Sequence, residues 1–278
     1  MIDGVILVWF ILTFASLLFV AVDIRNTPES PVLKWGFILL VAYTGPVGLL
    51  LYVIGCREPL KGLHERYVAV LWRQVLGSTM HCVSGDGVGI LAGAVIGAYL
   101  HLSSGLHITL EYVLGFGFGW LIFQALFMRD SQGGSYRRAL SNTFLPELVS
   151  MNALMAGMVP LMSFLMASIP GAHNPLAARF WFTMSMALLL GFILAYPINW
   201  WLVSRNLKHG MMTVRPNGSP PVAHDSRDHG TIDPQTMGDT HDSHAGADGK
   251  TATGTEVAIV TIISFVMLGV GLIVTLVL

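Results

Sequence analysis

The chain has 278 residues, of which 54% are apolar and 11% are charged, and its formal net charge is −1. An ordinary soluble domain carries about a quarter charged residues, so this composition indicates a membrane protein. Nucleic-acid binding needs a surplus of basic residues, and the balance of 15 Lys and Arg against 16 Asp and Glu provides none. Two cysteines are too few for a disulfide-rich secreted scaffold.

Seven stretches have the roughly 20 apolar residues that a helix needs to cross a bilayer. In chain order they are 4–22, 33–55, 76–100, 108–128, 144–167, 180–203 and 257–278. We therefore predict an all-α, polytopic transmembrane bundle of about seven spans. The first stretch lacks a basic flank and its apolar run is longer than a signal-peptide core, so we expect it to remain as a helix.

The basic residues predict an orientation for this bundle. With seven spans, twelve of the fifteen Lys and Arg residues fall on one side, and only Arg25, Lys34 and Arg179 fall on the other. Cytoplasmic connections carry the excess of Lys and Arg in membrane proteins. The prediction is therefore a cytoplasmic N-terminus and a C-terminus outside.

The segment 206–255 separates a six-helix bundle, 1–205, from the last helix, 256–278. It is rich in Gly, Asp, His, Thr and Pro and poor in large apolar residues, which predicts a disordered cytoplasmic linker. Alternating His and Asp side chains suit weak binding of ions such as zinc, although a simple solvated linker would have the same composition. The candidate ligands in this tract are His224, His229, His241 and His244.

The third span, 76–100, contains the most informative polar residues. His81, Cys82 and Asp86 lie within six residues of one another, and Cys82 and Asp86 are one helical turn apart. An Asp inside a bilayer costs about 2.5–3.5 kcal/mol on an insertion scale, so its presence indicates a function. We interpret the three side chains as an intramembrane metal site, with hydrogen-bonded packing of the helices as the alternative.

Polar residues on other spans are expected at a similar depth and would form a vestibule open to the cytoplasm. The candidates for a polar or proton relay are Gln124, Glu147, Asn152 and Asn199. On the opposite side, His107 and Glu111 are one turn apart and are expected at the membrane interface.

Methionines on the fifth span form a stripe along one helix face. Thioether sulfur is a soft ligand that suits Cu(I), whereas the alternative interpretation is that Met fills gaps in an apolar core. The residues assigned to the metal pathway are Met151, Met155 and Met158.

Glycines recur at every fourth residue of the third span: Gly85, Gly89, Gly93 and Gly97. Such a ridge lets another helix approach closely. Pro46, inside the second span, removes a backbone hydrogen bond and predicts a kink.

Three segments resemble an uncharacterised bacterial membrane family, domain of unknown function 4396. They are HCVSGDGVGI at 81–90, EYVLGFGFGWLIFQ at 111–124 and TFLPELVSMNALMAGM at 143–158. The resemblance covers about 71–212 and implies a location in the bacterial inner membrane, but it implies no activity. Family members often carry a second cysteine after the first. That cysteine is absent here, so only Cys56 could supply a second thiolate.

Two functional hypotheses follow from the sequence. The first is an integral membrane protein that binds or transports a transition-metal ion, copper first and zinc second. The second is a non-catalytic structural or assembly subunit of a membrane complex, in which the glycine ridge contacts a partner or a second copy of the chain. No catalytic motif was found, so we expect no enzyme activity. The expected partners are the lipid bilayer, a metal ion and such a membrane partner, with no nucleic acid.

Overall fold

The computed structural model describes residues 2–57, 63–125, 135–210 and 252–277. In these ranges the secondary structure is helical, without extended sheets. The long helices are α1 (Ile2–Asp23), α2 (Pro31–Gly55), α4 (Leu71–Tyr99), α5 (Ser104–Gly117), α7 (Tyr136–Ser168), α8 (Ala178–Ser204) and α9 (Gly254–Val277). The short elements are η1 (Ile24–Asn26), α3 (His64–Val68) and η2 (Phe118–Gln124), the last a π-helical continuation of α5.

Seven helices in the described residues are long and apolar enough to cross a membrane, counting α5 with η2 as one. They match the seven stretches predicted from the sequence and confirm an all-helical, multi-pass membrane protein. Large apolar side chains point outward from the bundle, as on α1, where Leu7 is 62% and Phe14 is 63% exposed. Such apolar surface suits lipid tails, because a soluble monomer rarely exposes so much of it.

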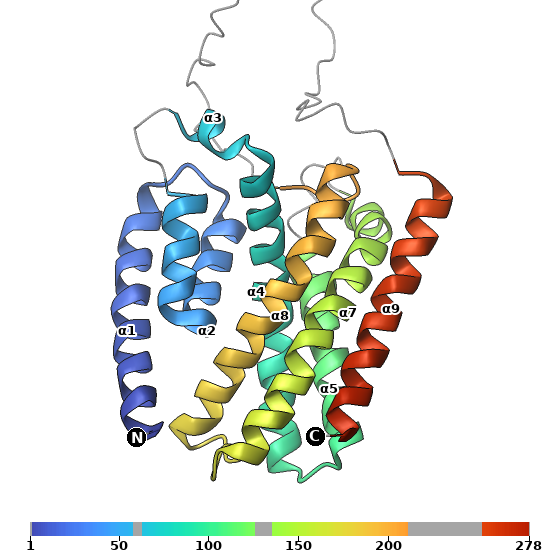
Figure 1. The fold of residues 1–278 in the computed structure, drawn as a ribbon. Helices are drawn as coiled ribbons and strands as arrows, with labels where there is room; N and C mark the ends of the chain where they lie inside the picture. The colour runs from blue at the N-terminus through green and yellow to red at the C-terminus, as the bar shows by residue number, and fades with distance from the viewer. Residues whose placement is uncertain (1, 58–62, 126–134, 211–251, 278) are drawn as a thin grey trace, which may run out of the picture.

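Helices α4 and α7 are the most buried of the long helices that the structure describes, and Figure 1 shows α4 behind α8. The glycine ridge of α4 lies against α5 and η2. A Cβ added at Gly93 would lie 2.8 Å from Glu111 Cα, and one at Gly89 would collide with the Leu114 carbonyl oxygen. Glycine is needed at these positions because the two backbones are in direct contact.

Helix α2 reverses its direction at Gly45, whose φ of +57° and ψ of −133° are not helical. The next residue, Pro46, has no backbone N–H and cannot continue the hydrogen-bond ladder. The Phe37 and Tyr52 rings consequently lie 5.5 Å apart, although 15 residues of straight helix would separate them by about 22 Å. The kink predicted from Pro46 is thus a complete turn, and α2 is a helical hairpin.

Both ends of the hairpin lie at the same end of α4. Gly55 packs on Leu76, and Leu33 faces the same cavity as Gly77. The chain therefore enters and leaves α2 on one face of the bundle. Figure 1 shows the result, with the N-terminus and the C-terminus at the same end.

This path corrects the predicted orientation, which placed the two termini on opposite sides. That prediction assumed that α2 crosses the bundle, whereas the reversal at Gly45 returns the chain to its starting face. Arg25 and Lys34, which were assigned to the other side, lie at the face where α4 begins. Lys34 Nζ donates to the Arg25 carbonyl oxygen, and the neighbouring Asp23 pairs with Arg57 at 3.0 Å. We call this end of the bundle the cationic face. Of the Lys and Arg residues that the structure describes, only Arg179 lies at the other end.

Candidate functional site: a buried acid–thiol–ammonium network

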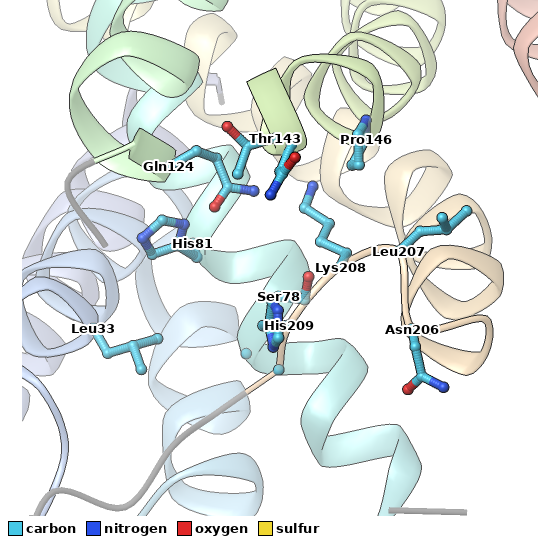
Figure 2. Close-up of a pocket in the computed structure, with 13 residues that line it drawn as sticks. Leu33, Ser78, His81, Gln124, Thr143, Pro146, Asn206, Leu207, Lys208 and His209 are labelled. Carbon is cyan, nitrogen blue, oxygen red and sulfur yellow. The ribbon is translucent and has the colours of Figure 1, made fainter. Parts of the chain in front are cut away.

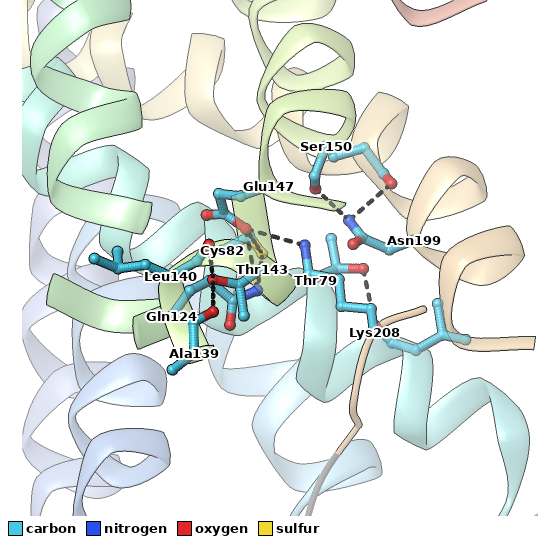
Figure 3. A network of polar contacts seen from close by, with 12 residues as sticks. Thr79, Cys82, Gln124, Ala139, Leu140, Thr143, Glu147, Ser150, Asn199 and Lys208 are labelled. Carbon is cyan, nitrogen blue, oxygen red and sulfur yellow. Dashed lines mark hydrogen bonds and ion pairs between the residues drawn. The ribbon is translucent and has the colours of Figure 1, made fainter. Parts of the chain in front are cut away.

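A network of buried polar side chains joins α4, η2, α7 and the segment after α8 (Figure 3). The Cys82 thiol donates to Oε2 of Glu147 at 3.0 Å, and Gln124 Nε2 donates to the same oxygen at 3.1 Å. Lys208 Nζ donates to it as well, at 3.2 Å. The Glu147 carboxylate is the centre of this network, and its side chain is fully buried.

Lys208 reaches the network because the chain turns back where α8 ends. Asn206 has a positive φ of 56°, and the Leu207 N–H donates to the Leu202 carbonyl oxygen at 2.9 Å. This is the left-handed ending that commonly terminates a helix. It points the next side chain, Lys208, into the bundle, where the residue is only 6% exposed.

The charge of Lys208 is stabilised by its neighbours. Burial by itself would lower the pKa of this ammonium, but Cys82 and Glu147 act in the opposite direction and raise the pKa above its ordinary value. Lys208 therefore keeps a positive charge next to the Glu147 carboxylate, inside a region from which water is largely excluded.

A second buried carboxyl group, that of Asp86, lies beside the first. A Cβ added at Gly119 would collide with Asp86 Oδ1 and would lie 2.8 Å from Glu147 Oε1. The missing side chain at Gly119 thus leaves the space that both carboxyl groups occupy. Among the described residues, the Asp86 oxygens receive no hydrogen bond apart from an interaction with Glu147.

The composition of this cluster has an electrostatic consequence. Two carboxylates beside one ammonium would leave a net negative charge in the interior, which is costly to bury. A further proton on the cluster or a bound cation restores neutrality. A proton and a cation would therefore be alternative ways to neutralise this cluster.

A cavity of about 280 Å³ leads to this network from the cationic face (Figure 2). Its lining includes Ser78, His81, Gln124, Thr143 and Lys208. The position of this cavity agrees with the predicted polar vestibule. His81 faces the cavity, whereas Cys82 and Asp86 lie deeper in the bundle.

The other predicted relay residues lie outside the network. Asn199 donates to Ser150 at 2.8 Å and belongs to the contact between α7 and α8. Asn152 accepts from Tyr112 at 2.6 Å and donates to Ser264 at 3.1 Å, so it joins α7 to α5 and α9. Both amides connect helices.

The predicted methionine pathway is spread over two helix contacts. Met151 Cε lies 2.7 Å from the Cβ position of Gly115 on α5, whereas the Met158 side chain lies near Gly191 on α8. Met155 is fully buried. Of the three, Met151 is one turn beyond Glu147 on α7. The linker residues His224, His229, His241 and His244 lie outside the described residues.

Sequence reasoning missed two features. Glu111 was expected at the interface, but it is fully buried, with its Oε1 3.4 Å from His107 Nε2. Lys208 was assigned to the linker, although its closeness to the end of an apolar helix was a signal that it could fold back.

The part of the chain that matches a known family contains the whole network. A family model for a domain of unknown function, DUF4396, matches residues 71–208. The chain belongs to this family. The DUF4396 region begins where α4 begins and ends at Lys208, so it contains every residue of the network. No curated protein and no solved structure matches the chain.

Proposed function

We propose that the protein transports a transition-metal ion, copper first and zinc second, through a site formed by Cys82, Glu147 and Asp86. A thiolate and two carboxylates, with His81 at the cavity, give a donor set that binds transition-metal cations. The single observation that carries this proposal is the buried contact of Cys82 and Lys208 with the same Glu147 oxygen.

Lys208 occupies the place that a transported cation would take. Its ammonium lies between the cavity and the two carboxyl groups, at 3.2 Å from Glu147. An ion that enters from the cavity would displace the ammonium and bind Cys82 as a thiolate. The thiol proton would then leave the site, because a metal ion binds the deprotonated form of cysteine.

The preference for copper over zinc depends on the thioether of Met151, which lies next to the site. Met151 follows Glu147 by one turn on α7, and its methyl group lies near Gly115, where the Asp86 carbonyl oxygen is 3.3 Å from the same Cβ position. A thiolate followed by a thioether suits Cu(I), whereas a thiolate with carboxylate and imidazole suits zinc.

Protons would move in the opposite direction along buried carboxyl groups. Glu147 and Asp86 lie side by side next to Gly119, and Glu111 lies beside Gly93, nearer the opposite face; all three are fully buried. His107 ends this series, with its side chain 20% exposed. Ionisable residues in the interior of a membrane protein mark ion and proton pathways.

Uptake into proteoliposomes tests this proposal. The full chain is reconstituted, and entry of Cu(I), kept reduced, or of Zn²⁺ is followed with a metal-sensitive dye inside the vesicles. We expect Cys82→Ser and Asp86→Asn to abolish uptake. The matched control is Cys56→Ser, which removes the only other cysteine and should leave uptake intact. Equal uptake by wild type and Cys82→Ser would refute the proposed site.

The assembly hypothesis loses its main structural support. It assigned the glycine ridge of α4 to a partner, but α5 and η2 of the same chain cover that ridge, with Gly85 next to Phe123 and Gly93 next to Glu111.

A further inference from the structure

A second cluster of ligand-type side chains lies outside the DUF4396 region. Glu29 precedes α2, Cys56 follows α2, and His64 begins α3. A carboxylate oxygen of Glu29, the Cys56 Sγ and a ring nitrogen of His64 all lie within 4.8 Å of one another. Across the described ranges, this is the one group of three or more His, Cys, Asp or Glu residues arranged in that way.

The cluster is closed off from solvent. Glu29 is 4%, Cys56 is 0% and His64 is 1% exposed. His64 Nε2 lies 3.6 Å from Glu29 Oε1 and 3.2 Å from the Cys56 carbonyl oxygen. Among the described residues, neither carboxylate oxygen of Glu29 has a well-aligned hydrogen bond, although the Ser30 backbone N–H interacts with the group. A buried carboxylate with so little donor support is unfavourable, so a cation between these three side chains would compensate its charge.

Burial changes the pKa values of two groups in this cluster. It raises the pKa of Glu29 well above its ordinary value, against smaller opposite effects of the Ser30 backbone and Lys34. It also raises the pKa of the Cys56 thiol, and the charge of Glu29 adds to that effect.

We propose that Glu29, Cys56 and His64 form a zinc site. The combination of one sulfur, one nitrogen and one oxygen donor suits Zn²⁺, which binds them at about 2.0–2.3 Å and often leaves a fourth position to water. Three ligand atoms within 4.8 Å of one another need only small side-chain movements to surround such an ion. On binding, the Cys56 thiol releases its proton to solvent, and the ion keeps its oxidation state.

The site would fasten the two ends of the α2 hairpin to α3. Glu29 comes two residues before the first residue of α2 and Cys56 directly after its last, so one ion would bridge the start and the end of the hairpin. The ligands lie at the cationic face and outside the Cys82 network, so this proposal is independent of the proposed transport function.

Cobalt(II) is the probe for this site, because a cobalt–thiolate bond gives a sulfur-to-metal charge-transfer band that histidine or carboxylate ligands do not give. The experiment uses the full chain, purified in detergent without a tag, reduced and freed of metal. Only Cys56 and Cys82 can produce the band, so the histidines of segment 211–251 do not interfere. In the Cys82→Ser chain, we expect the band to saturate at one Co²⁺ per chain and to disappear when Zn²⁺ is added.

Variants of the ligands test whether His64 and Glu29 bind the metal ion together with Cys56. In the Cys82→Ser background, His64→Gln and Glu29→Gln should each weaken Co²⁺ binding by at least about tenfold, since even residues that only support metal ligands have effects of that size. The same chain without these changes is the matched control. Absence of the band in Cys82→Ser, or equal affinity in all three chains, would overturn the proposal.

Thiol protection keeps the test valid if a ligand variant fails to fold. In the Cys82→Ser chain, Cys56 is the only cysteine, and bound Zn²⁺ should slow its alkylation by a maleimide at least about tenfold, since a metal-bound thiolate is withheld from reaction. An alkylation rate that does not change with Zn²⁺ would count against the site. A band that needs only Cys82 would support the transport site and refute this one.

Discussion

Lys208 and Glu147 form an ion pair at 3.2 Å with side-chain exposures of 4% and 0%, although 61 residues separate them in the chain. Removing one partner of a buried pair leaves the other charge uncompensated. Lys208→Met should therefore destabilise the protein by about 3–5 kcal/mol, the usual cost of breaking such a pair. The measurement is the unfolding midpoint in detergent, with Lys208→Arg as the variant that keeps the charge.

The double variant Lys208→Met, Glu147→Gln separates charge pairing from packing. It removes both charges together and should recover most of the lost stability, since only the unpaired charge is expensive. If the double variant is as unstable as the sum of the two single variants, the ion pair is not the energetic unit that the geometry indicates.

Gly89→Ala tests the contact between α4 and α5. The new methyl group would collide with the Leu114 carbonyl oxygen, which belongs to the backbone and cannot rotate away. We expect a loss of about 1–3 kcal/mol, the usual cost of overpacking. Gly117→Ala is the control, because no atom lies within 4 Å of its Cβ position. A similar loss in both variants would mean that helix contact is not the cause.

The two ends of the chain should lie on the same side of the membrane. The hairpin at Gly45 gives an even number of crossings, and the cationic face carries nearly all described Lys and Arg residues. By the positive-inside rule we expect the cationic face to be cytoplasmic and both termini to be outside. Topology reporters fused to each terminus, in separate chains, check this. Reporters on opposite sides would show that α2 crosses the membrane.

Removal of metal should weaken the attachment of the α2 hairpin. If zinc binds between Glu29, Cys56 and His64, a strong chelator will lower the unfolding midpoint, because a ligand at 100 times its Kd stabilises by about 2.7 kcal/mol. Cys56→Ser should start at the lower midpoint and show no response to the chelator. The Cys82→Ser chain should respond as wild type does. A response in Cys56→Ser would assign the effect to another site.

The sequence was sufficient for features that depend on composition and periodicity. Apolar runs predict the seven long helices, and the glycine spacing predicts the surface of α4 that packs against another helix. Hydropathy does not distinguish a helix that crosses from one that returns, so the reversal at Gly45 was missed, although Pro46 indicated a kink. The same reversal brings Glu29 and Cys56 together, which explains why that cluster had no sequence signal.

The polar network was predicted in part. Cys82, Gln124 and Glu147 were identified because polar residues in apolar helices stand out. Lys208 was not identified, because the position of its side chain depends on a single residue with left-handed backbone conformation, Asn206, which directs the chain back into the bundle.

The end of α8 and the start of α9 lie at the same end of the bundle, the cationic face (Figure 1), and residues 206–210, directly after α8, line the cavity. The 206–255 segment is therefore tied to that face at both of its ends, whatever path it takes between them. If His224, His229, His241 or His244 hold an ion, the two attached ends of the segment limit how far that ion can move from the cationic face, so its effective concentration there depends on the length of the tether. Shortening the segment would change how often a captured ion meets Lys208, without altering a single contact inside the bundle.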